Sequence, residues 1–154
     1  MGPEVNFRAD AIAIFTYAVT LAAPVVTWLS MQKARARAFE QHRARQVGLL
    51  VVCWVAVLLL ELKIRISGGS GSLVATASPE YRGLARALVG VHITGAVVTY
   101  LVWTWLAVAS WRRFRVALPG EFSRRHKRLG LFVFGGLVFT AISATGMFFF
   151  TFVL

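Results

Sequence analysis

Four long stretches of the chain contain no charged residue and are rich in apolar side chains; they are Ala11–Gln32, Gln46–Leu60, Ala87–Trp111 and Leu129–Leu154. The third stretch has 25 residues, and a helix over it would extend about 37 Å at a rise of about 1.5 Å per residue. That length crosses a hydrocarbon core of about 30 Å with some tilt. Because 58% of the 154 residues are hydrophobic, a soluble domain of this size could not bury them. The sequence therefore predicts an all-α integral membrane protein, a four-helix bundle.

The boundaries of the four helices follow from the ends of the apolar stretches. We expect a single transmembrane domain over residues 1–154, with helices at about 11–32, 45–66, 82–111 and 127–153. The second uncharged stretch covers only about 22 Å, so its helix must continue through Glu61 to about Ile66 for the chain to cross the membrane. The segment SGGSGS at Ser67–Ser72 favours a flexible outer loop over residues 67–79.

Basic residues cluster in two of the connections, at 33–45 and at 112–128, which together hold twelve of the seventeen Lys and Arg residues. Basic loops of membrane proteins remain on the cytoplasmic side. We therefore expect a multi-pass protein of the bacterial inner membrane with both basic loops inside and both termini on the outer, periplasmic side. The inner loops would contact anionic lipid headgroups. The net charge of +11 does not indicate nucleic-acid binding, because the basic residues lie between hydrophobic stretches.

The three histidines are the side chains best suited to hold a metal-centred cofactor. His42 and His126 precede the second and fourth apolar stretches, so the expected topology places both at the inner face. Together, and joined by Gln46 one turn into the second helix, they could ligate a haem iron or form part of a transition-metal site that would still need another ligand or water. The alternative is that both histidines only face lipid headgroups among the arginines.

His92 lies inside the third stretch, about 30 Å along the helix from its inner end. It cannot share an iron atom with another histidine of the chain, because the two axial ligands of a haem lie a few ångströms apart. Glu61, at the outer end of the second helix, could join His92 in an open metal site. The alternatives are an ion pair between Glu61 and Arg65 and an interhelical hydrogen bond for His92.

The remaining sequence features indicate packing and binding rather than catalysis. Gly136, Thr140 and Ala144 recur at intervals of four in the fourth stretch, which predicts a close approach of that helix to a neighbour. The single cysteine, Cys53, lies inside the second stretch, where a buried apolar role is expected. The chain has no phosphate-binding glycine pattern, no paired catalytic carboxylates and no nucleophile with a base at readable spacing. An enzyme is therefore not favoured.

Four segments of the chain carry a resemblance to a known family; they are RADAIAIF at 8–15, HRARQVGLL at 42–50, YRGLARALVGVHITGAVVTYLVW at 81–103 and RRHKRLG at 124–130. The chain resembles a family of small four-helix bacterial membrane proteins, largely of unknown function, that includes CtaM/YozB-type proteins linked to the assembly of haem-copper oxidases. The resemblance extends over nearly the whole chain and matches the family's histidines at His42, His92 and His126. It departs from the family pattern at Glu61 and Lys63, where the family commonly has a further histidine.

The resemblance and the membrane topology together predict a non-catalytic inner-membrane accessory subunit or assembly factor of a respiratory or other electron-transfer complex, with other membrane subunits as partners. One alternative is a b-type cytochrome with haem b between His42 and His126. Another is an open metal-binding membrane protein that uses His92 and Glu61. The haem hypothesis requires His42 and His126 to converge in space, whereas the accessory role allows them to point apart.

Overall fold

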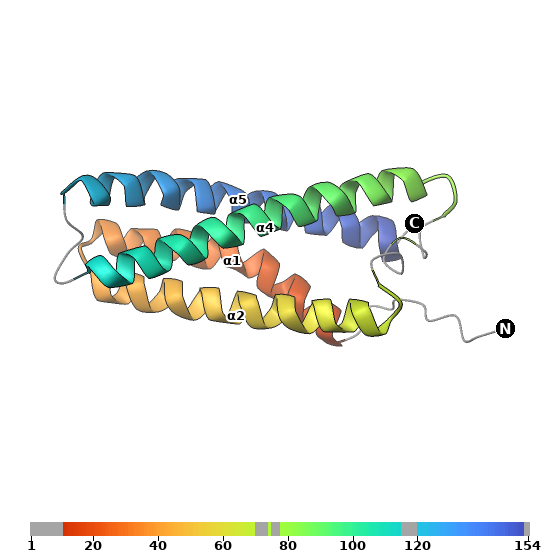
Figure 1. Ribbon diagram of the computed structural model, residues 1–154, viewed down its shortest axis with the longest axis horizontal. Helices are drawn as coiled ribbons and strands as arrows, with labels where there is room; N and C mark the ends of the chain where they lie inside the picture. The colour runs from red at the N-terminus through yellow and green to blue at the C-terminus, as the bar shows by residue number, and fades with distance from the viewer. Residues whose placement is uncertain (1–10, 70–73, 75–77, 115–119, 153–154) are drawn as a thin grey trace.

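The computed structural model describes residues 11–69, 74, 78–114 and 120–152. Four long helices account for most of them; these are α1 (Ala11–Arg35), α2 (Phe39–Ile66), α4 (Arg82–Arg113) and α5 (Gly120–Phe152) (Figure 1). Each helix is long and apolar enough to cross a membrane, and no strand occurs in the described ranges. The predicted all-α fold is confirmed for the described residues, and the four helices fit the predicted multi-pass membrane protein in length and composition.

Two helices begin earlier than the sequence indicated. α2 begins at Phe39 rather than at about 45, and α5 begins at Gly120 rather than at about 127. The added turns, 39–44 and 120–126, contain Glu, Gln, Ala and Arg, which are good helix formers, and their charged ends can remain in water. The basic loops predicted at 33–45 and 112–128 are therefore largely helical where they are described. Most of the predicted outer loop at 67–79 lies outside the described residues.

The connection between α1 and α2 is a tight turn at the end of α1. Arg37 adopts a positive φ of 58°, and the N–H groups of Arg37 and Ala38 donate to the carbonyl oxygens of Ala34 and Lys33, at 3.1 and 2.9 Å. A residue in this left-handed conformation closes the last turn of a helix by returning N–H groups to its final carbonyls. The turn folds α2 directly back along α1.

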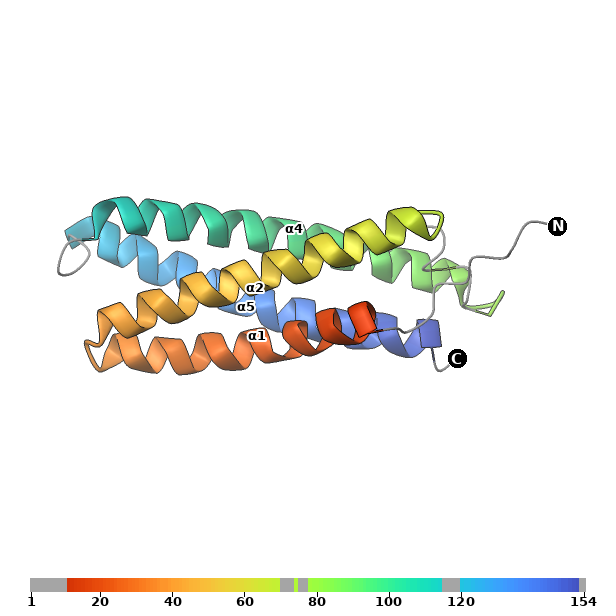
Figure 2. The same ribbon diagram turned by 90° about the horizontal axis from the view of Figure 1, so that it is seen from below.

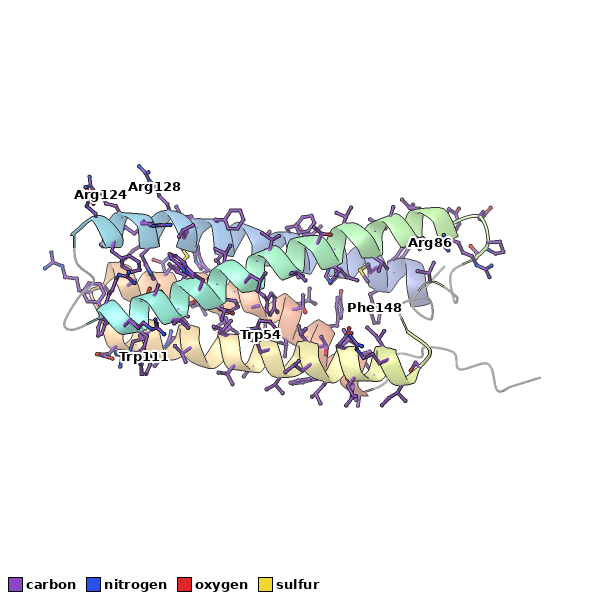
Figure 3. All side chains as sticks on the ribbon, in the orientation of Figure 1. Trp54, Arg86, Trp111, Arg124, Arg128 and Phe148 are labelled. Atoms are coloured by element: carbon purple, nitrogen blue, oxygen red, sulfur yellow. The ribbon has the colours of Figure 1, made fainter. Side chains whose placement is uncertain are left out.

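The helices form two hairpins, α1–α2 and α4–α5, whose members pack along each other. The hairpins meet mainly through α1 and α5, with a slighter contact between α2 and α4. The turn between α1 and α2 lies at the same end of the bundle as the end of α4 and the start of α5 (Figures 1 and 2). Figure 3 shows Arg124 and Arg128 at this end, with Trp111, and Arg86 toward the opposite end. We call the end with Arg124 and Arg128 the basic end.

Small and medium side chains, together with Tyr100 and Trp103, form the interior, while many other large apolar side chains cover the outside. Leu58 and Ile142 are 60% and 68% exposed, as expected where lipid and not water surrounds a bundle. Inside, Cys53 is fully buried, as expected. Gly136 faces α4 so closely that an added Cβ would lie 2.7 Å from Cγ2 of Thr99. The close approach predicted for this part of α5 is thus confirmed.

Candidate functional site

His42 of α2 and His126 of α5 face each other at the basic end of the bundle. Their ring centroids lie 6.2 Å apart, and the ring planes are nearly perpendicular, at 83°. The two residues come from different hairpins, and α2 and α5 are not among the helix pairs that pack along each other. The rings therefore meet across the interior. The convergence that the haem hypothesis requires is present.

Ser30, a fully buried residue of α1, fixes the ring of His42. Nδ1 of His42 lies 3.0 Å from the carbonyl oxygen of Ser30 and 2.9 Å from its Oγ, and this hydroxyl donates to the carbonyl oxygen of His42 at 3.2 Å. A carbonyl oxygen can only accept, so Nδ1 carries the proton in this arrangement. The lone pair is then on Nε2, and an imidazole held in this way by a carbonyl is typical of metal ligands.

Ser110 of α4 holds His126 in a comparable way, with its Oγ 2.9 Å from Nδ1 of the ring. A hydroxyl can accept from Nδ1–H or donate to Nδ1; when it accepts, the lone pair is on Nε2. Each histidine is thus oriented by a serine on the other helix of its own hairpin. The sequence did not identify Ser30 or Ser110 as hydrogen-bond partners of the histidines. A lone serine near the end of an apolar stretch has no spacing pattern that predicts which residue it contacts.

Both histidines line a cavity of about 630 Å³ to which all four helices contribute. Its volume lies within the range of about 300–1,000 Å³ typical of cofactor and small-molecule sites. Aromatic and aliphatic side chains form much of its wall, among them Phe39, Trp103 and Leu106. Such walls suit a flat apolar ligand.

The part of the cavity nearest the basic end is cationic. Four basic side chains line it, namely Arg35, Arg37, Arg43 and Lys127, and its described lining includes no Asp or Glu. The guanidinium of Arg43 lies over the rings of Trp111 and Phe114, at 4.7 and 4.8 Å from their centroids, and also pairs with Glu40 at 3.1 Å. Arginine and lysine in this arrangement favour anionic groups such as carboxylates. The cavity therefore has a basic mouth.

The opposite end of the cavity carries polar groups of a different kind. Nε1 of Trp103 donates to Oε1 of Gln46 at 3.2 Å, which fixes the orientation of the Gln46 amide, because the alternative would bring two donors together. Nε2 of Gln46 and Oγ1 of Thr27 are buried and have no hydrogen-bond partner among the described residues. Both residues line the cavity.

His92 and Glu61, the predicted outer metal pair, each have a different partner. Nδ1 of His92 lies 2.8 Å from Oγ of Ser143 on α5, and Oε1 of Glu61 accepts from Nε of Arg65 at 2.7 Å. These are the interhelical hydrogen bond and the ion pair that the sequence allowed as alternatives. The part of the chain that the structure describes contains no group of three or more His, Cys, Asp or Glu residues suited to a metal ion. A metal site at His92 and Glu61 stays a prediction.

Comparison with models of protein families, with curated proteins and with solved structures finds no match to this chain. The resemblance to the small four-helix family therefore stays a prediction. The side chains of the cavity are the basis for a functional assignment.

Proposed function

We propose that the protein is a membrane b-type cytochrome that holds a haem between His42 and His126. The observation that supports this function most directly is the 6.2 Å separation of the two ring centroids. An imidazole nitrogen lies about 1.1 Å from its ring centroid and binds a metal ion at about 2.0–2.1 Å, so two histidines in line on one ion have centroids about 6.3 Å apart. The two separations agree, and Ser30 holds His42 in the tautomer that leaves Nε2 available.

A haem fits this site better than a bare metal ion. Two histidines are too few for a closed zinc site, and no third His, Cys, Asp or Glu joins them in the described ranges. A haem iron needs only two axial ligands from the protein. The cavity also offers apolar walls for the ring and a basic mouth for its carboxylates. When bound, the haem would supply one-electron chemistry, while this chain would provide the ligands, their orientation and a mostly apolar environment.

A reduced-minus-oxidised absorption spectrum tests the proposal, recorded on the protein purified in mild detergent and supplied with haemin. We expect sharp α and Soret bands that are lost in His42→Ala and in His126→Ala. His92→Ala is the matched control and should retain them, because His92 bonds Ser143 and does not line the cavity. A flat spectrum of the unsubstituted protein, or bands that survive in both cavity variants, would exclude this site.

A second candidate function is the accessory or assembly role in an electron-transfer complex. It is supported by a stripe of small, exposed residues along one face of α4, namely Gly83, Ala87, Gly90 and Thr94. A Cβ added at Gly83 or Gly90 would meet nothing within 4 Å, so this face is open to a transmembrane helix of a partner. Gly90→Leu should abolish co-purification of such a subunit, whereas Gly48→Leu, at an open glycine of α2, should not. If Gly90→Leu retains every co-purifying subunit, α4 is not the contact face.

In either role we place the basic end of the bundle in the cytoplasm of a bacterium, with both termini outside. This orientation is supported by the arginines gathered at that end (Figure 3) and by the preference of basic segments for the cytoplasmic side. Anionic lipid headgroups would then surround the mouth of the cavity.

A further inference from the structure

The deep end of the cavity, opposite the basic mouth, has hydrogen-bond donors without a partner among the described residues. Gln46 is held by Trp103 so that its amide nitrogen, and not its oxygen, is free. Thr27 is only 3% exposed, and its hydroxyl lacks a partner in the described ranges. Burying a polar group without a hydrogen bond is costly. These two side chains therefore indicate that the ligand of the cavity brings an acceptor to this end.

The position of these donors relative to the basic mouth determines which part of a ligand would reach them. On α1, Arg35 at the mouth and Thr27 at the deep end of the cavity are separated by two turns, about 12 Å along the helix axis. On α2, Gln46 lies one turn deeper than His42. A flat ligand that places its carboxylates among the mouth cations, with its metal between the histidines, presents its opposite edge to Thr27 and Gln46.

We propose that Thr27 and Gln46 form a hydrogen-bonding subsite for a carbonyl oxygen on the edge of a porphyrin opposite its carboxylates. The inference rests on the proposed function, and it specifies the class of cofactor: a haem that carries an oxygen substituent at that edge, in preference to protohaem, whose vinyl and methyl groups cannot accept. The hydroxyl of Thr27 and the amide N–H groups of Gln46 would donate to the same oxygen or to neighbouring oxygens. Both donors would then be satisfied without a trapped water.

The test compares the binding of protohaem and of diacetyl deuterohaem, a synthetic derivative, to the purified protein. Diacetyl deuterohaem carries acetyl groups in place of both vinyl groups of protohaem and is otherwise the same. We expect it to bind about tenfold more tightly than protohaem, the effect of roughly one good hydrogen bond gained by buried donors. Its carbonyl stretching band, measured by resonance Raman spectroscopy, should shift to lower frequency relative to the same haem free in detergent.

Thr27→Val should remove most of the preference for the acetyl haem and return the carbonyl band toward its free position. Thr20→Val is the matched control, because Thr20 lies on the same helix, donates to the carbonyl oxygen of Thr16 at 2.8 Å and does not line the cavity. Gln46→Glu is a second variant, which keeps an oxygen for Trp103 and replaces the free donor by an acceptor. It should also lower the preference.

Equal affinity for the two haems, together with an unshifted carbonyl band, would overturn the subsite and show that water satisfies these donors. That outcome would leave the axial ligands His42 and His126 intact. If neither haem bound, the cytochrome function itself would be refuted. The two failures are therefore distinguishable in one set of measurements.

Discussion

Replacement of Gly136 by alanine tests the packing that holds α4 against α5. An added Cβ would lie 2.7 Å from Cγ2 of Thr99 and 3.0 Å from its Cβ, and would also contact its hydroxyl. Thr99 cannot move aside easily, because it is 2% exposed and its hydroxyl donates to the carbonyl oxygen of Gly95 at 2.7 Å. The helices must separate locally, or Thr99 must leave its rotamer and lose that hydrogen bond.

We expect Gly136→Ala to lower the free energy of unfolding by about 1–3 kcal/mol, the usual cost of overpacking a close contact. Gly135→Ala is the matched control, because a Cβ at Gly135 meets nothing within 4 Å. There the better helix propensity of alanine should leave stability unchanged or raise it by about 0.5–1 kcal/mol. Unfolding by dodecyl sulfate in mixed micelles, followed by circular dichroism, measures both. If the two variants unfolded at the same detergent fraction, the close approach of α4 and α5 would be wrong.

Three further predictions concern the site and the topology. Ser110→Ala should weaken haem binding by about 10–100-fold, the usual effect of losing a group that orients a ligand. The loss in Ser30→Ala should be smaller, because that variant keeps the backbone carbonyl that holds His42. Haem titration compares the two variants, and a larger loss in Ser30→Ala would contradict this prediction. Glu61→Gln should change the free energy of unfolding by less than about 1 kcal/mol, because an exposed ion pair contributes little, and a larger loss in a zinc-loaded sample would instead support the outer metal site. In a background without the native cysteine, Glu80→Cys should react with an impermeant maleimide on intact cells and Arg37→Cys only after lysis; the reverse pattern would invert the topology.

The fold could be predicted from the sequence because the length of its uncharged, apolar stretches is enough to identify membrane-crossing helices. A stretch of about 20 or more uncharged, apolar residues that crosses a membrane is a helix, since every backbone group must be satisfied internally and a strand of a membrane barrel needs only about 9–11 residues. The starts of α2 and α5 were harder to predict. Hydropathy marks where lipid ends, whereas a helix ends where its backbone hydrogen bonds end, and arginine and alanine support further turns beyond the apolar stretch.

The candidate site was predictable only in outline. An even number of crossings between His42 and His126 places both at one face, so their proximity was a hypothesis that topology allowed. Their separation and their serine partners depend on the rotation of each helix about its axis, which a sequence without clear amphipathic faces does not specify. The cavity is also invisible in the sequence, because its volume depends on which side chains of four helices fail to fill the space between them. Gln46 was noted near His42, but its link to Trp103 spans two hairpins and has no local pattern.

The division of the site between two hairpins has a consequence for how the protein is made. His42 with Ser30 belongs to the first hairpin, and His126 with Ser110 belongs to the second, so neither hairpin alone can provide both histidines of the proposed haem site. Hairpins that enter the bilayer one after the other would create the site only when the second docks on the first. Because a ligand that binds only the docked state stabilises it, by about 4 kcal/mol at a thousandfold excess over Kd, loading would lock the hairpins together. Cofactor content would then report completed assembly of the bundle.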